Sequence, residues 1–325
     1  MSPDRHGGWL DAPSLSNMVP NGNDDRRYVS TTLVSFASQE FRPQQAYLSR
    51  SAINVGIDRV ISWNDERLRR ESFFHDHRDV FQQKTGFGCW LWKPYIIRYE
   101  LSKLLEADLL IYWDVGRRRY PHRFELSPKP LLLWCLENDG IFPGLWVPQY
   151  GPNKRWTKRD CFVAMNCDTA AYWDHPQVQA TFSIWQKNSK ALAFIEEWLT
   201  WCQKPEVISD DPNRLGLPNF DEFVAHRHDQ SVLTNLVIKR QLNCFGPGSP
   251  VPGDGDKDIN NAIDRILQRE DRIRWREFRK PFQVLGNKLG DRTWWDRKKL
   301  GDPAWWRRRV QSAATLARSI CRKLA

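Results

Sequence analysis

The sequence predicts an α/β fold in which a mixed, mostly parallel sheet is flanked by helices and followed by a basic helical tail. Two observations carry this prediction. Residues 28–63 follow the order strand, helix, strand, which is a βαβ unit. Residues 109–113 are a continuous apolar run, Leu-Leu-Ile-Tyr-Trp, as expected of a strand that is buried on both faces of a sheet.

The chain divides into three expected parts. Residues 1–28 are rich in Gly, Pro, Asn, Asp and Ser and lack the apolar segment of a signal peptide, so we expect a disordered leader. Residues 29–247 are expected to form the folded domain. The composition changes after the Gly- and Pro-rich stretch 246–253, so residues 248–325 are expected to be a helical, basic, Trp-rich extension.

Charge and cysteine content limit the classes of partner. The formal net charge is +10, but residues 287–325 hold eleven Lys and Arg against three acids, so the remainder carries only +2. This distribution weakens the case for a nucleic-acid-binding core, and no nucleic-acid partner is expected. Seven scattered cysteines without a CxxC motif indicate reduced, mostly buried thiols, and no run of eighteen apolar residues exists. We therefore expect a cytoplasmic protein.

The basic tail contains tryptophan pairs beside cationic clusters. Trp294 and Trp295 precede Arg297–Lys299, and Trp305 and Trp306 precede Arg307–Arg309. Indoles suit the headgroup layer and cations face anionic lipid, so the pattern favours association with the inner face of a membrane through residues 287–325. A docked packing helix and a tail that meets nucleic acid are the alternatives.

The remaining elements are expected from apolar spacing and from Gly and Pro positions. After the βαβ unit, whose helix is expected to run from after Arg42-Pro43 to Val55, a charged helical region should cover 65–83. A glycine-bounded aromatic cluster, 86–94, leads to a helix whose apolar residues are Ile96, Ile97, Leu101, Leu104 and Leu105. Beyond the 109–113 strand we expect a basic irregular region over 117–130, helices over 131–137, 157–166, 189–202 and 230–242, a strand over 178–185, and loops over 139–144 and 203–221.

Asp114 is the first candidate site residue. It follows the buried strand 109–113 and precedes Gly116, which permits a tight turn. The carboxyl end of a strand in an open α/β sheet is where such folds bind ligands, and one carboxylate there can hold a hard cation that bridges phosphate oxygens. A turn Asp with no ligand is the alternative.

Two other segments carry candidate side chains. His226-Arg-His228-Asp229-Gln230 stands just before a helix, whose N-terminus suits an anionic ligand. The alternative is a simple N-cap by Asp229 or Ser231.

Trp90-Leu-Trp92-Lys93-Pro offers aromatic surface beside a cation, as for a base or sugar ring next to a diphosphate, although core packing is also compatible. Motifs for dinucleotide, P-loop and serine-hydrolase chemistry are absent.

Taken in order, these segments resemble a nucleotide-diphospho-sugar glycosyltransferase of the GT-A fold, of the bacterial capsule and lipopolysaccharide type, similar to retaining family-8-like transferases. The resemblance rests on the order and spacing of Leu33–Ala37, Gly86–Pro94, Asp108–Gly116, Gln179–Trp198 and His226–Leu233. It implies a Rossmann-like sheet and makes 29–247 the GT-A-like catalytic domain. It implies hexosyl or related transfer from a nucleotide sugar to a glycan or lipid-linked acceptor in surface polysaccharide synthesis.

The resemblance also implies residue roles. Asp114 corresponds to the first acid of the family's DxD motif, which binds Mn²⁺ or Mg²⁺ with the donor diphosphate, whereas Gly116 stands where the second acid is expected. A metal would then be held by Asp114 with His226 or His228. Asp229 and Gln230 would be the catalytic pair, and Asp229 or Asp221 could deprotonate the acceptor. The donor would contact Phe36, Ser38, Trp63, Trp92, Lys93, Asp114 and Gly116.

Two further functions are compatible with the sequence. The incomplete acidic motif permits a nucleotide-sugar-binding protein that has lost catalysis. The basic tail permits a peripheral membrane or nucleic-acid-binding protein that acts through residues 287–325.

Overall fold

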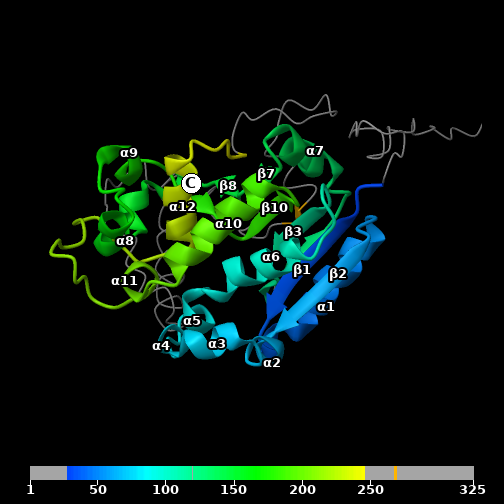
Figure 1. Ribbon diagram of the computed structural model, residues 1–325, viewed down its shortest axis with the longest axis horizontal. Helices are drawn as coiled ribbons and strands as arrows, with labels where there is room; N and C mark the ends of the chain where they lie inside the picture. Colours follow the sequence, from blue (N-terminus) through cyan, green and yellow to red (C-terminus); the bar gives the residue numbers. More distant parts are fainter. Residues whose placement is uncertain (1–27, 119, 246–266, 269–325) are drawn as a thin grey trace, which may run out of the picture. The chain divides into compact units, whose positions relative to one another are not determined.

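A five-stranded sheet forms the centre of the folded domain (Figure 1). The computed structural model describes residues 28–118, 120–245 and 267–268. The strand order is β2-β1-β3-β10-β7. The strands are β1 (Thr31–Ala37), β2 (Arg59–Asn64), β3 (Leu109–Trp113), β10 (Phe182–Gln186) and β7 (Ile141–Phe142).

The strand directions place several carboxyl ends along one side of the sheet. We call this side the ligand edge, because open α/β sheets bind their ligands there. β1 pairs parallel with both β2 and β3, so the carboxyl ends of these three strands meet at one edge. β10 runs antiparallel to β3 and to β7, and its register places Phe182 opposite Trp113. The chain therefore enters β10 at the same edge where β3 ends. The predicted mixed, mostly parallel sheet is confirmed.

Helices cover both faces of the sheet. Successive side chains of a strand point to opposite faces, so a strand that is apolar throughout needs a packed layer on each side. On one face, Val34, Leu110 and Trp185 pack with α6 (Trp92–Ser102), α10 (Ser189–Cys202) and α12 (Asp229–Lys239). On the other face, Leu33, Ile111 and Ile184 pack with α1 (Arg42–Asn54) and α7 (Lys129–Glu137). β3 supplies both cores and is buried along its whole length, as its apolar run predicts.

Shorter elements connect the layers. The helices are α2 (Asp65–Leu68), α3 (Ser72–Asp76), α4 (Arg78–Phe81), α5 (Gly86–Cys89), α8 (Arg159–Ala164), α9 (Ala170–Trp173), α11 (Pro205–Ile208) and the 3-10 turns η2 (Gln39–Phe41), η3 (Pro148–Tyr150) and η4 (Asn153–Arg155). The strand pairs are β4 (Gly116–Arg117) with β5 (Tyr120–Pro121), β8 (Leu145–Trp146) with β9 (Val178–Gln179), and β6 (Arg123–Phe124) with β11 (Leu267–Gln268).

Six expectations for the elements need correction. The predicted irregular region 117–130 contains β5 and β6, and the predicted loop 203–221 contains α11. The predicted loop 139–144 contains β7, a strand of two residues that is too short to show a pattern. The predicted strand 178–185 is interrupted at Ala180–Thr181 and contributes to two sheets. The charged region 65–83 forms three short helices rather than one. Leu105 is 64% exposed, because α6 ends at Ser102 and releases the chain before that position.

Residues 1–27 of the predicted leader and almost all of the predicted tail, including both tryptophan pairs, lie outside the described residues. Leu267 and Gln268 form a strand beside β6, whereas the sequence predicted a helix there. The six cysteines in the described part of the chain are buried and unbridged, so their predicted burial is confirmed. Among the described residues, no helix combines the length and the apolar character needed to cross a membrane.

Replacing Asn188 by alanine should lower the unfolding free energy by about 0.5–2 kcal/mol. Asn188 is the N-cap of α10, where its side chain accepts the Ala191 N–H at 2.8 Å and donates to the Asp139 carbonyl at 3.0 Å. Denaturant unfolding would measure the change. Serine at this position restores only the cap, so Asn188→Ser should recover part of the loss; equal losses for both variants would contradict this explanation.

Candidate functional site

Three predicted site residues meet in one charged cluster. The Lys93 Nζ lies 3.1 Å from Asp229 Oδ2 and 3.6 Å from Asp114 Oδ1. The side chains of Lys93 and Asp229 are each 4% exposed, whereas that of Asp114 is 29% exposed. The cluster therefore has one carboxylate that solvent reaches, and behind it a covered ammonium and a second, covered carboxylate.

Three separate elements place these side chains. Asp114 follows β3 at the ligand edge of the sheet, and Lys93 lies in the first turn of α6. Asp229 is the first residue of α12, so a carboxylate of the protein itself occupies the N-terminus of that helix. The segments are far apart in the sequence, and the packing of α6 and α12 on one face of the sheet brings them together.

The main chain between β9 and β10 holds the cluster in place. The Ala180 carbonyl accepts a hydrogen bond from Lys93 Nζ at 3.2 Å, and the Ala180 N–H donates to Gln230 Oε1 at 3.3 Å. The next carbonyl, that of Thr181, accepts the Asp114 N–H at 2.9 Å. This turn explains why the predicted strand is interrupted, because its peptide groups bond to the site rather than to a sheet.

Burial and mutual charge set the protonation of the cluster. Burial raises the pKa of Asp229 to about 6, although the ammonium of Lys93 acts in the opposite direction. Burial would lower the pKa of Lys93, but the carboxylates of Asp114 and Asp229 outweigh it, so this pKa is raised. Burial and the neighbouring Asp114 hold the pKa of the Tyr112 phenol well above its ordinary value. Lys93 is therefore charged at neutral pH.

Strained backbone lies on both sides of the cluster. Five consecutive residues, Gly86 to Trp90, have φ between 52° and 82°, and three of them are not glycine. Each residue other than glycine in this conformation costs about 1–2 kcal/mol. His228, directly before Asp229, has φ 53° and ψ −120°, and its ring lies 5.4 Å from that of Trp90. Strain of this kind concentrates at functional sites, where the surrounding fold holds it.

Gln230, the second predicted catalytic residue, takes part in a buried polar network. Its Nε2 donates to Gln177 Oε1 at 2.7 Å, while its Oε1 accepts from Ala180. Gln177 is 2% exposed and donates in turn to Asn153 Oδ1 at 3.1 Å and Thr157 Oγ1 at 3.2 Å. Both atoms of the Gln230 amide group are thus engaged inside the protein, so this residue positions the site.

Three of the predicted donor-binding aromatic residues lie in the core instead. Trp63 is fully buried, donates its N–H to Glu100 Oε1 at 2.6 Å, and has the Arg67 guanidinium 3.6 Å above its ring. Phe36 and Trp92 stack on each other with ring centroids 4.0 Å apart. These rings are buried and have packed partners, and their contact with a donor stays a prediction.

The two small predicted donor-binding residues remain at the ligand edge. Ser38 follows β1 and is partly exposed, and its side chain makes no capping hydrogen bond. Gly116 has φ 78° and begins β4. Asp221, the alternative base, is exposed on the loop before α12. Whether these residues contact a donor or an acceptor stays a prediction.

The histidines do not fit a metal site at Asp114. The Nδ1 of His226 accepts the Lys158 N–H at 3.2 Å, and its Nε2 lies 2.8 Å from the Val207 carbonyl, to which it must donate. The Nδ1 of His228 donates to the Ile208 carbonyl at 2.8 Å, and its Nε2 faces the Asp210 carboxylate at 3.6 Å rather than Asp114. Within the described ranges, no three His, Cys, Asp or Glu side chains are grouped to hold a metal ion. These imidazoles instead bind α11 to the segment before α12.

Burial sets the protonation state of both histidines. It lowers the pKa of His226 well below its ordinary value of 6.5, and the neighbouring His228 and Lys158 act in the same direction. Burial also lowers the pKa of His228. Both imidazoles are therefore neutral at pH 7, in the protonation states that their carbonyl partners require.

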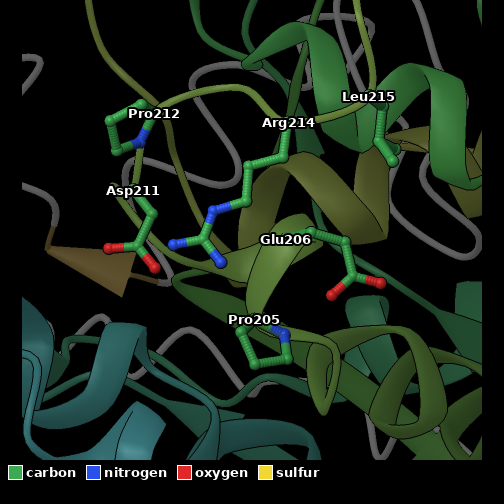
Figure 2. A pocket seen from close by; sticks show the side chains of 6 residues that line it. All are labelled: Pro205, Glu206, Asp211, Pro212, Arg214 and Leu215. Atoms are coloured by element: carbon green, nitrogen blue, oxygen red, sulfur yellow. The ribbon is translucent and has the colours of Figure 1, made fainter.

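The predicted functional loop 203–221 is fixed to the body and borders a pocket. Lys158 Nζ donates to the Ser209 and Asp211 carbonyls at 3.2 and 3.1 Å, and the Asp160 carboxylate accepts the N–H groups of Arg214 and Leu215. The pocket has a volume of about 340 Å³, and Figure 2 shows Arg214 extending into it with Asp211 and Glu206 on either side. Its lining residues do not include Lys93, Asp114 or Asp229.

Sequence reasoning missed Tyr112, Gln177 and Ala180. The Tyr112 hydroxyl donates a hydrogen bond to Asp114 Oδ1 and so helps fix that carboxylate. The alternation along β3 places Tyr112 and Asp114 on the same side, and this could have identified the pair. No sequence signal points to Gln177 or to the peptide groups of Ala180, because their roles depend on how distant segments pack.

Comparisons with known proteins find distant similarity among solved structures. No protein-family model matches the sequence, and no match was found among curated proteins. Among solved structures, the chain is similar to the apo structure of WbbM, a bifunctional glycosyltransferase, with a TM-score of 0.40 and 9% sequence identity. The similarity covers 72% of this chain and 41% of that one, so this chain spans less than half of its length. The described architecture is a mixed α/β fold with flanking helices.

Proposed function

We propose that the chain is a glycosyltransferase of the GT-A type, which moves a sugar from a nucleotide-diphosphate sugar to a glycan or lipid-linked acceptor in surface polysaccharide synthesis. The observation that carries the proposal is the Lys93, Asp114 and Asp229 cluster at the carboxyl end of β3. Ligands of open α/β sheets bind at this edge. The strained turn beside Lys93 adds support, since such backbone is retained where function requires it.

The transfer needs orientation and charge stabilisation more than reactive groups. The acceptor oxygen forms a bond to the anomeric carbon, and the bond from that carbon to the diphosphate oxygen breaks with both electrons leaving on the diphosphate. In this proposal Asp114 contacts the ligand, because it is the exposed carboxylate of the cluster, and it takes the acceptor proton. Asp229 and Gln230 are positioning residues that act through Lys93 and Ala180.

A second candidate function is nucleotide-sugar binding without turnover. The burial of Asp229 favours it, because that carboxylate is 4% exposed and does not reach a ligand in the described arrangement. The two functions predict the same binding and differ only in the formation of product.

A panel of UDP-, GDP-, ADP- and dTDP-sugars would test the proposal. We expect heat of binding for at least one donor, measured with EDTA and with Mn²⁺, and release of the nucleoside diphosphate when acceptor is present. Binding without release would favour the second candidate. Absence of binding in both conditions would reject both.

Asp114→Asn should abolish turnover while the fold is retained and donor binding is not weakened, because asparagine cannot take the acceptor proton. Asparagine keeps an acceptor for the Tyr112 hydroxyl but loses the charge that Lys93 balances. Circular dichroism would verify folding. Asp139→Asn is the matched control, because Asp139 is an exposed acid just before β7, at the opposite edge of the sheet. Release of the nucleoside diphosphate at the wild-type rate by the Asp114 variant would remove Asp114 from the site.

A further inference from the structure

The positive charge of Lys93 is already balanced inside the cluster. One ammonium faces two carboxylates, at 3.1 and 3.6 Å, and it also donates to the Ala180 carbonyl. With both acids ionised, the cluster has a net charge of −1. A nucleoside diphosphate brings further negative charge to the same edge of the sheet, so Lys93 alone does not suffice to bind it. Another cationic group must supply the missing charge.

Two arginines stand in the right place in the chain. Arg117 and Arg118 follow Asp114 by three and four residues and lie in the hairpin formed by β4 and β5. A chain spans at most about 3.6 Å per residue, so the backbone of Arg117 lies within about 11 Å of that of Asp114. Both arginine side chains are exposed.

The hairpin is fastened to the end of β3. Its register pairs Gly116 with Pro121. Just beyond it, the His122 N–H donates to the Val115 carbonyl at 3.1 Å, and the His122 ring donates to the Asp114 carbonyl. The same ring stacks on Trp113, with centroids 5.3 Å apart. The position of the arginines relative to Asp114 is therefore determined by the hairpin rather than by a free loop.

Arg117 and Arg118 also differ from six described arginines that pair with a carboxylate. In the described part of the chain, neither of them takes part in an ion pair or a hydrogen bond through its guanidinium. The arginines that do pair with a carboxylate are Arg42, Arg67, Arg98, Arg123, Arg159 and Arg240. Two adjacent, uncompensated guanidinium groups beside a ligand edge are suited to phosphate, which the planar fork of arginine binds with two parallel hydrogen bonds.

We propose that Arg117 and Arg118 bind the diphosphate of the nucleotide donor and take the place of the divalent metal ion expected from the resemblance. The inference rests on the proposed function, because it concerns the donor of that reaction. It agrees with two features of the site: Gly116 stands where a second acid would be needed, and the ring nitrogens of His226 are both bonded to the main chain.

The test measures the affinity of the full-length protein for ADP, GDP, UDP and CDP by calorimetry, in EDTA and in Mn²⁺. We expect the wild type to bind at least one of them in EDTA. Arg117→Gln/Arg118→Gln should weaken that binding at least tenfold, and added salt should weaken the binding of the wild type more than that of the variant. The fold of the variant should be unchanged, because both replaced side chains are exposed.

Arg59→Gln/Lys103→Gln is the matched control. It also removes two exposed cations, but Arg59 begins β2 and Lys103 precedes β3, at the opposite edge of the sheet. This variant should bind as the wild type does. Equal affinity in the Arg117/Arg118 variant and the wild type, or binding that requires Mn²⁺, overturns the inference and leaves the proposed function standing. No binding of any diphosphate in either condition overturns both.

Discussion

Replacing Lys93 by methionine is expected to lower the unfolding free energy by about 3–5 kcal/mol at pH 7.5, since it leaves a buried charge without its partner. The Asp229 carboxylate is 4% exposed, and its Oδ2 has no hydrogen bond in the described part of the chain beyond the ion pair with Lys93. Methionine has a similar length and fits under the Tyr112 ring, which Lys93 approaches at 5.4 Å. The loss of unfolding free energy therefore reflects the missing ammonium charge rather than a change in side-chain volume.

A double variant separates charge from packing. Lys93→Met/Asp229→Asn removes both charges of the closer pair, so most of the lost free energy should return. Lys190→Met is the control for a surface pair, because Lys190 and Asp139 are both exposed, and it should cost about 0–1 kcal/mol. Urea unfolding measures all three variants.

The cost of Lys93→Met should also depend on pH. Without the ammonium, the pKa of Asp229 rises further, so the carboxylate takes up a proton and loses its charge as the pH falls towards 5. The loss in unfolding free energy should therefore shrink in that direction. A loss below about 1 kcal/mol at pH 7.5 would contradict the burial and pairing described for this cluster.

Acidification should destabilise the fold through His226 and His228. Their pKa values are lowered in the folded state, so the unfolded chain binds more protons. The stabilisation is present above the unfolded value of 6.5 and is lost as the pH falls below it. Each histidine contributes a slope of up to about 1.4 kcal/mol per pH unit. Protonation would turn the Nδ1 of His226 from an acceptor into a donor facing the Lys158 N–H.

Asp229 changes the unfolding free energy with pH in the direction opposite to that of the histidines. Its pKa is raised from 3.8 to about 6, so its stabilisation is present below 3.8 and is lost as the pH rises through about 6. Urea unfolding between pH 7.5 and 5 should therefore show a net decrease at low pH that becomes steeper in Asp229→Asn and shallower in His226→Gln. NMR titration of the wild type should show His226 remaining neutral below pH 6.5. Titration at 6.5 or above would reject this explanation.

The parts of the fold that sequence predicts are those with a long, regular pattern. The helix Ser189–Cys202 has the predicted bounds, and β3 follows its apolar run, because burial on one or both faces leaves a clear periodicity. β7 and the turn at Ala180 were missed for the opposite reason. Two buried residues show no period, and a turn held by distant side chains has no local signal.

The candidate site was predicted in part. The sequence points to Lys93, Asp114 and Asp229 separately, and the structure brings a carboxylate oxygen of each acid within 4 Å of the Lys93 ammonium. For aromatic residues such as Trp63 and Trp92, the sequence does not reveal whether the ring faces the core or a ligand, and the structure shows that both rings are buried. The left-handed turn at Phe87–Trp90 also has no signature, since residues other than glycine seldom adopt positive φ.

The turn at Ala180–Thr181 contributes to the site only through its peptide groups, and this has a consequence for mutagenesis. Alanine scanning leaves peptide groups unchanged, so it would report position 181 as dispensable and would skip position 180 altogether. The hydrogen bonds to Lys93, Gln230 and Asp114 do not depend on the side chains of this turn, although Ala180 is 2% exposed and packs in the core, so only a small side chain fits there. Only proline, or an ester in place of the amide, removes the N–H that Gln230 needs.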